Sequence, residues 1–366
     1  MDFNFSEFII KAHKANASDL HFREGKAPSL RIDGKILRTA MPPLDEQDFQ
    51  NILLKIAKKD ILEKIKVSNN VDFTYEVPEF SRYRVNYCKD LGLPKLTLRV
   101  IPYEIPTLEE LHLPQYLGEL TKFNNGIIIV TGPTGSGKST TLASMVDLIN
   151  KHQQKHIITI EDPVEFLYTD RKSLVTQRGL GVDTETFESG IKYALRQDPD
   201  VILVGEIRDR ETLEAAIEAS ETGHLVLSTM HTNSCVQTLN RILGFFEDGS
   251  SSLVVQRVMN TLRAVVAQKL LPKVQGGLAA AVEIMSVTPA ICDYLMKSKF
   301  EDVYALMQRS KTPNLSTMNS SIYALFKYGL ITKETALDYS DNKIEMEQML
   351  RGIYHGAKNS SEGNLI

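Results

Sequence analysis

Residues 132–139 carry the clearest chemistry in this sequence. They read Gly-Pro-Thr-Gly-Ser-Gly-Lys-Ser and fit the phosphate-binding pattern G-x-x-x-x-G-K-[ST] at every position. The glycines allow the backbone to curl, so that several N–H groups can face one anion. Lys138 would bring a positive charge to the β- and γ-phosphates, and Ser139 a hydroxyl to Mg²⁺. The predicted nucleotide contacts in this loop are Gly132, Pro133, Thr134, Gly135, Ser136, Gly137, Lys138, Ser139 and Thr140.

The flanking segments argue against a chance glycine-rich turn. The apolar run 126–130 is typical of a buried parallel strand, and Ser139–Asn150 has the composition of a helix whose dipole would favour an anion. This context predicts a nucleoside triphosphate site. No Asn-Lys-x-Asp signature for guanine occurs, which favours ATP with Mg²⁺, although the loop alone does not predict hydrolysis.

Two other strand ends offer carboxylates for hydrolysis, which needs one acid to hold Mg²⁺ and another to activate water. The apolar run 201–204 is followed by Gly205 and Glu206, the arrangement of a Walker B element. The run that ends at Ile160 continues as Glu161-Asp-Pro-Val-Glu165, which by itself is also typical of a charged surface turn. With the phosphate loop upstream, we expect both acidic ends at the carboxyl edge of one sheet.

Histidines and arginines form the remaining candidates. His224 and His231 flank the apolar strand predicted at 225–228 and could sense a γ-phosphate, but a structural role for each is equally compatible with the spacing. Arg82, Arg84 and Arg99 lie on strands of alternating polarity. Their guanidinium groups suit a triphosphate, yet the alternation alone favours a charged outer sheet face.

The chain changes character near two prolines, Pro102 and Pro106. Before them, 5–15 and 44–66 have helical spacing, whereas 29–32, 71–77, 81–87 and 95–101 resemble strands, which predicts a smaller α+β domain over 1–101. After a linker at 102–122, strands and helices alternate as in a parallel α/β core over 123–366. Beyond about Val254 the pattern predicts mostly helix.

Composition narrows the function classes. The 366 residues have a formal net charge of −4, and basic residues alternate with acidic ones, which disfavours a nucleic-acid translocase. No apolar run is long enough to cross a bilayer, and the three cysteines form no Cys-x-x-Cys pair. These features predict a cytoplasmic protein that reaches a membrane only through partners.

Taken together, the motifs resemble those of bacterial secretion-type ATPases, most closely the PilT/PilU-type motors of type IV pilus retraction. The resemblance runs through nearly the whole chain in the family's order. The matching stretches are 18–21 (Ser-Asp-Leu-His), 82–86 (Arg-Tyr-Arg-Val-Asn), 132–139, 160–165, 195–209 and 222–232.

The resemblance implies a PAS-like first domain, a RecA-like P-loop ATPase core and a helical C-terminal part. It assigns the Walker B position to Glu206, the general base to Glu165 with Glu161 and Asp162 in support, and the His box to His224 and His231. Arg82, Arg84, Arg99 and Arg196 are expected to reach the nucleotide, some across a subunit boundary. The implied assembly is a homo-hexamer beneath an inner-membrane platform protein, with ATP hydrolysis coupled to pilus retraction and twitching motility.

Two departures from the family pattern keep alternatives open. Where retraction motors usually read Ala-Ile-Arg-Asn-Leu, residues 290–294 read Ala-Ile-Cys-Asp-Tyr, which moves the chain toward accessory PilU-like members that assist a paralogous motor. The loop at 89–92 also lacks an arginine that is frequent there. A pilus assembly or type II secretion motor is disfavoured by the absence of a four-cysteine site, and a non-hydrolysing scaffold by the presence of Lys138, Glu165 and Glu206.

Overall fold

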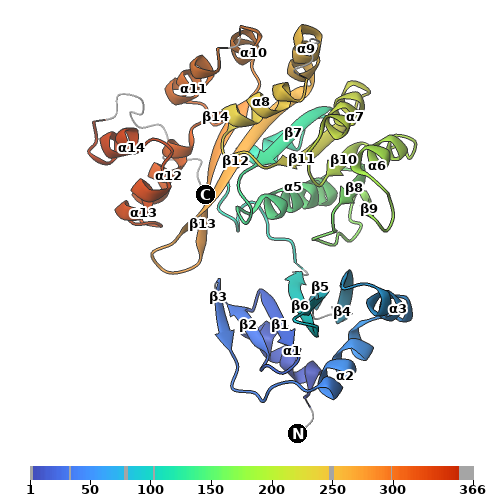
Figure 1. The fold of residues 1–366 in the computed structure, drawn as a ribbon. Helices are drawn as coiled ribbons and strands as arrows, with labels where there is room; N and C mark the ends of the chain where they lie inside the picture. Colours follow the sequence, from blue (N-terminus) through green and yellow to red (C-terminus); the bar gives the residue numbers. More distant parts are fainter. Residues whose placement is uncertain are drawn as a thin grey trace. The chain divides into compact units, whose positions relative to one another are not determined.

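The structure is a computed structural model that describes residues 3–32, 34–77, 81–101, 104–246, 251–297 and 299–353, without the side chains of 251–254. The chain forms two compact units, Met1–Glu104 and Ile105–Ile366, which are described separately below (Figure 1). Of the predicted linker, 102 and 103 lie outside the described residues. No helix in the described ranges combines the length and apolarity needed to cross a membrane.

The first unit is one antiparallel sheet covered by helices. Its strand order is β3-β2-β1-β6-β5-β4. The strands are β1 (Asp19–Arg23), β2 (Ser29–Ile32), β3 (Lys35–Arg38), β4 (Asn70–Val77), β5 (Ser81–Asp90) and β6 (Leu93–Ile101), and the helices are α1 (Phe5–Lys14), α2 (Glu46–Ile56) and α3 (Lys59–Val67). The predicted strands and helices of this region are confirmed.

Local sequence explains these elements. Side chains of β5 alternate between buried and half-buried positions, as expected for a strand with one face on a core. Helix α2 begins with a capping box, in which the side chains of Asp45 and Asp48 each accept the backbone N–H of the other. Apolar side chains of α1 and α2, such as Phe8 and Phe49, pack with Phe22 of β1 in the core.

The second unit contains an eight-stranded sheet of order β14-β13-β12-β7-β11-β10-β8-β9. The six strands from β12 to β9 in this order pair in parallel, and β13 and β14 join as antiparallel strands. The strands are β7 (Gly126–Thr131), β8 (His156–Glu161), β9 (Leu174–Gly179), β10 (Val201–Val204), β11 (Leu225–Met230), β12 (Leu262–Pro272), β13 (Leu278–Ser286) and β14 (Leu315–Ser316). The predicted α/β core with parallel strands is therefore confirmed.

Helices cover both faces of this sheet (Figure 1). One face packs against α4 (Tyr116–Leu120) and α5 (Lys138–His152). The other face packs against the remaining helices. These are α6 (Phe187–Ala194), α7 (Arg210–Glu221), α8 (Cys235–Gly244), α9 (Ser251–Thr261), α10 (Pro289–Met296), α11 (Phe300–Arg309), α12 (Met318–Lys327), α13 (Lys333–Tyr339) and α14 (Lys343–Leu350). Adjacent residues of β7 divide between the two cores, with Ile127 on one face and Ile128 on the other.

The prediction of helix from about Val254 onward was wrong for residues 262–286. This segment forms the antiparallel pair β12–β13, which extends the central sheet beside β7. Both strands are buried on two faces over most of their length, so they lack the alternation that marks a half-exposed strand. They are also rich in alanine and leucine, which have high helix propensity. The helical part resumes at Pro289.

Candidate active site

The phosphate loop connects β7 to α5 at the carboxyl edge of the central sheet. Its glycines have positive φ angles of 145° at Gly132, 80° at Gly135 and 85° at Gly137, a region that other residues rarely adopt. Helix α5 then begins at Lys138 with Gly137 as its cap, and no side chain accepts its first N–H groups. The loop therefore presents backbone donors and the positive end of a helix dipole to an anion.

The side chain of Lys138 folds back over this loop. Its ammonium group donates to the carbonyl oxygens of Gly132 at 2.8 Å and Pro133 at 3.0 Å. Burial lowers the pKa of Lys138, while the negative charges of Glu206 and Glu165 oppose that shift. Two of the predicted catalytic carboxylates thus lie close enough to act on this ammonium group.

Glu206 is 9% exposed and follows β10 at the same edge. One carboxylate oxygen pairs with Arg208, and the other has no hydrogen-bond partner. That second oxygen lies 3.3 Å from Nε2 of His231, without a hydrogen bond between them. The contact with Arg208 was missed at the sequence level, where the only available signal was a basic residue two positions after the acid.

The end of β11 fixes the position of His231. The Thr232 N–H donates to Oγ1 of Thr131 at 3.0 Å, and that hydroxyl donates to the Thr232 carbonyl at 2.8 Å. Thr131 is the last residue of β7 before the phosphate loop. His231 is consequently held beside the loop by a polar contact between two neighbouring parallel strands.

The acidic segment after β8 contributes one buried and one exposed carboxylate. Glu161 is 9% exposed, accepts the Glu165 N–H at 3.3 Å, and has one oxygen without a partner. Burial raises the pKa of Glu161. Glu165 is exposed. Glu161 therefore supports the backbone that carries Glu165.

Not every predicted residue reaches this edge within one chain. His224 precedes β11, and its Nδ1 lies 2.8 Å from the Ala219 carbonyl oxygen, at the opposite, amino edge of the sheet. Arg196 lies at that edge too, 6.0 Å from the Tyr193 ring. The nucleotide-binding roles of these two residues stay predictions.

The three arginines of the first unit that were predicted to reach the nucleotide lie on neighbouring strands, with Arg84 of β5 directly opposite Arg99 of β6. Arg99 donates from Nε to Asp19 at 3.0 Å, and Arg84 Nε lies 3.9 Å from Asp72. Arg84 and Arg99 line a cavity of about 290 Å³, together with Asp19, Asp72, Asn86 and Thr97. Arg82 pairs with Ile101 in the same ladder. Contact of these arginines with a nucleotide stays a prediction.

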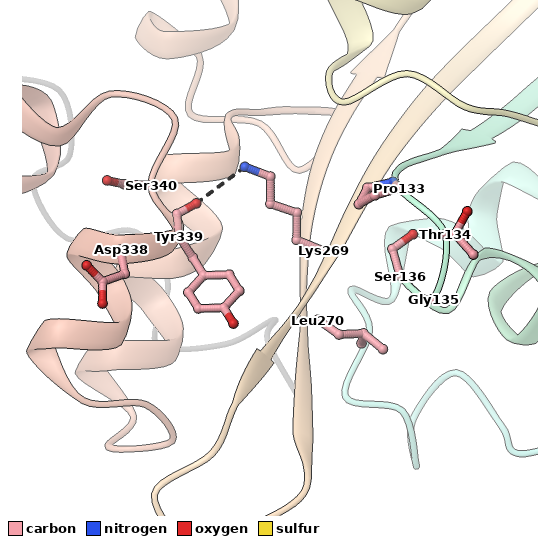
Figure 2. Close-up of a pocket in the computed structure, with 9 residues that line it drawn as sticks. All are labelled: Pro133, Thr134, Gly135, Ser136, Lys269, Leu270, Asp338, Tyr339 and Ser340. Carbon is pink, nitrogen blue, oxygen red and sulfur yellow. Dashed lines mark hydrogen bonds between the residues drawn. The ribbon is translucent and has the colours of Figure 1, made fainter. Parts of the chain in front are cut away.

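A second cavity, of about 330 Å³, adjoins the phosphate loop in the second unit (Figure 2). Its walls are loop residues 133–136, Lys269 and Leu270 of β12, and Asp338, Tyr339 and Ser340 at the end of α13. Lys269 Nζ donates to the Tyr339 carbonyl at 3.3 Å across it. The helical C-terminal part thus lies directly beside the phosphate loop.

The polar groups at the carboxyl edge fit a triphosphate with its metal ion. Oγ of Ser136 in the loop is buried without a partner, as are one oxygen each of Glu161 and Glu206. Buried polar groups are almost always paired in proteins, so a ligand is the expected partner. No three His, Cys, Asp or Glu side chains in the described residues form a metal site by themselves. Mg²⁺ in nucleotide sites usually takes one or two protein oxygens plus phosphate, which Ser139 and Glu206 would supply.

Comparison with known proteins identifies the family of this chain. Residues 4–312 match the family model described as type II/IV secretion system protein. The chain belongs to this family. It is 38% identical to the type IV pilus retractation ATPase PilT of Pseudomonas aeruginosa, over 91% of this chain and 97% of that protein. It is 36% identical to the type IV pilus ATPase PilU of the same organism, over 95% of this chain and 91% of that protein. Within the family it is therefore of the PilT/PilU type.

Solved structures give the same relationship. A crystal structure of the pilus retraction motor PilT with bound ADP matches with a TM-score of 0.88 and 41% identity, over 95% of this chain and all of that one. The ATPase DotB of Legionella pneumophila matches with a TM-score of 0.81 and 27% identity, over 96% of this chain and 97% of that one. The relatives span both units of the chain, so the two-unit architecture is shared with nucleotide-binding ATPases.

Proposed function

We propose that this protein is a motor ATPase that couples ATP hydrolysis to retraction of type IV pili. One observation carries the proposal: the phosphate loop, Glu206 and Glu165 follow β7, β10 and β8 at one carboxyl edge of the sheet, and the charges of both carboxylates act on Lys138. A scaffold that only binds nucleotide would not need two carboxylates at that position. Membership of the PilT/PilU-type family then supports the kind of work that hydrolysis performs.

The residues suggest a division of roles during hydrolysis. The loop N–H groups and Lys138 would hold the β- and γ-phosphates, and Glu165 would orient and deprotonate the attacking water. Ser139 and Glu206 would hold Mg²⁺, partly through water, and the ion would neutralise charge on the phosphates. His231 lies beside Glu206, where it would respond to the presence of the γ-phosphate.

We further propose that the chain works as a homo-hexameric ring under an inner-membrane platform protein of the pilus machine. Pulling on a helical filament needs repeated steps about one axis, which head-to-tail contacts in a closed ring provide. The first unit would serve as the PAS-like module and the second as the RecA-like core. Nucleotide binding would change the relation between them through a hinge near 101–107, and limited proteolysis that is unaffected by nucleotide would oppose this.

The altered motif at 290–294 bears on whether the motor acts alone. It lies in α10, where Ile291 is buried and Asp293 forms a 2.7 Å ion pair with Lys297 on the exposed side. The replaced arginine, asparagine and leucine positions thus lie on a helix with a solvent-facing side. An accessory, PilU-like role beside a paralogous motor would fit a partner surface changed in this way.

Steady-state ATP hydrolysis by the purified protein tests the proposal. We expect wild-type turnover, with Lys138→Ala and Glu165→Gln each reducing it by about 10²-fold or more. ADP binding should persist in Glu165→Gln, because this carboxylate acts on water rather than on the diphosphate. Binding of ATP without any turnover by the assembled wild-type protein would favour the nucleotide-binding scaffold.

A further inference from the structure

Strand β12 brings Gln268 to the phosphate loop from a distant part of the sequence. The strand runs parallel to β7, and its residues 265–267 pair with 129–131 at the end of that strand. The next residue on β12 is Gln268, whereas β7 ends at Thr131 and is followed by Gly132, the first loop residue. Gln268 therefore lies level with the loop and is 2% exposed.

Both ends of the Gln268 carboxamide are hydrogen-bonded to the phosphate-binding elements. Its Nε2 donates to the backbone carbonyl of Ser136 at 2.8 Å, within the loop. Its Oε1 accepts the hydroxyl of Thr141 at 2.8 Å, in the first turns of α5. All of these contacts are buried, so water does not compete for them. One side chain thus ties the loop to the helix that follows it.

The same residue explains two glycines of the motif. A Cβ atom at Gly132 would lie 2.3 Å from the backbone oxygen of Gln268, and one at Gly137 would lie 2.8 Å from its Nε2. At Gly132 this atom would meet backbone, so the loop or β12 would have to move, whereas at Gly137 it would displace the Gln268 carboxamide from its contact with Ser136. The close approach of Gln268 and the positive φ angles therefore restrict both positions to glycine.

The bond to Ser136 has a consequence for anion binding. In a trans peptide the N–H points opposite to the carbonyl, so fixing the Ser136 carbonyl toward Gln268 turns the Gly137 N–H away from it. Backbone N–H groups of loops with this pattern cradle nucleotide phosphates, so the Gly137 N–H, turned away from Gln268, would be free to meet one. We propose that Gln268 is a positioning residue that orients the loop N–H groups for nucleotide phosphates; this rests on the proposed nucleotide binding.

The affinity of the purified full-length protein for ADP, measured by calorimetry, tests this inference. Gln268→Glu keeps the size and the acceptor for Thr141 but places an oxygen against the Ser136 carbonyl. We expect it to weaken ADP binding by about tenfold or more. Thr141→Val removes only the second contact and should weaken binding by about threefold. The double variant Gln268→Met/Thr141→Val should bind ADP as weakly as Gln268→Met alone, because Gln268→Met already removes the contact that Thr141→Val removes.

A matched control separates positioning from general stability. Asn150 is also buried in the second unit, at the end of α5 opposite to the loop, and donates to the Thr169 carbonyl at 2.8 Å. Asn150→Ala should lower the melting temperature as Gln268→Glu does, yet leave ADP affinity unchanged. An ADP affinity of Gln268→Glu equal to that of the wild type would overturn the inference. If Gln268→Glu does not fold, an unchanged ADP affinity of Thr141→Val would overturn it. Failure of the wild-type protein itself to bind ADP would instead remove the proposed function.

Discussion

Polar side chains at the two edges of the parallel strands in the central sheet differ in how completely they are hydrogen-bonded. At the carboxyl edge, Glu161 and Glu206 are buried and each has an oxygen without a hydrogen-bond partner. At the amino edge, Asp200 accepts the His156 N–H at 2.9 Å and Lys155 at 3.2 Å. His224 likewise lies 2.8 Å from a backbone carbonyl oxygen. Asp200 and His224 are thus hydrogen-bonded within the protein, whereas Glu161 and Glu206 each keep one buried oxygen without such a bond.

This difference separates structural from functional polar residues in a sheet of one topology. A buried group that is left unpaired destabilises the folded protein, so its retention points to a ligand or a reaction. A paired group at the other end of the same strand needs no such explanation. Substitutions at the two edges should therefore differ in kind: those at the carboxyl edge should change turnover without a loss of stability, and those at the amino edge should lower stability without a change of turnover.

We expect the largest difference in kcat between the variants Glu206→Gln and Asp200→Asn. Glu206→Gln removes a charge proposed to hold Mg²⁺ and should reduce kcat by about 10²–10³-fold, with ADP affinity changed less than about threefold. Asp200→Asn should leave kcat unchanged and weaken folding by roughly 1 kcal/mol through its hydrogen bonds. Steady-state kinetics and thermal unfolding measure both. Loss of turnover in Asp200→Asn without loss of stability would contradict the assignment of a purely structural role to the amino edge.

The two histidines give a smaller contrast on one strand. His231→Ala removes the imidazole beside Glu206 and should lower kcat by about tenfold. His224→Ala removes the contact with the Ala219 carbonyl and should lower the melting temperature instead, by about 2–4 °C. ADP affinity should stay the same in both variants. Weaker ADP binding in His224→Ala would instead support the nucleotide-binding role that the family resemblance implies for this residue.

The carboxyl edge was predictable because its signals are local in the sequence. The phosphate loop is eight consecutive residues whose glycines, lysine and serine each have a physical reason. Glu161 and Glu206 follow apolar runs, and parallel strands bring such ends to one edge. The strand assignments behind this argument were confirmed. The family resemblance was also confirmed, and it supplied the expectation of a motor that the loop alone does not give.

The support of the loop could not be predicted from the sequence. Gln268 contacts residues more than 120 positions earlier, and it lies in a segment whose composition favours helix. The alternation that would reveal β12 is lost because that strand is buried on both faces. Arg208 is close to Glu206 in the sequence, yet only the conformation of the loop between them decides that they pair.

The smallest expected effect is a pH dependence of opposite sign at the two edges. Burial raises the pKa of Glu161, so the ionised carboxylate at neutral pH destabilises the folded state. For Asp200, burial opposes but does not outweigh the hydrogen bonds from His156 and Lys155 and their positive charges, and its pKa is lowered. Because of Glu161, the stability of the wild-type protein falls as the pH rises above about 4.5. The stability that Asp200 contributes is lost as the pH falls below about 3.8.

Substitution at each position should reveal these signs in the protein without nucleotide. Glu161→Gln should raise the melting temperature at pH 8 by on the order of 2–4 °C, and this gain should vanish below about pH 4.5, where the wild-type carboxyl is neutral in both states. Asp200→Asn should lower the melting temperature at pH 8, and by less, because its side chain is 42% exposed and solvent screens the charge. That loss should shrink below about pH 3.8. If both variants shifted the melting temperature in the same direction at pH 8, interactions within the folded chain would already offset the cost of burying the Glu161 carboxylate. The two edges would then differ in position alone.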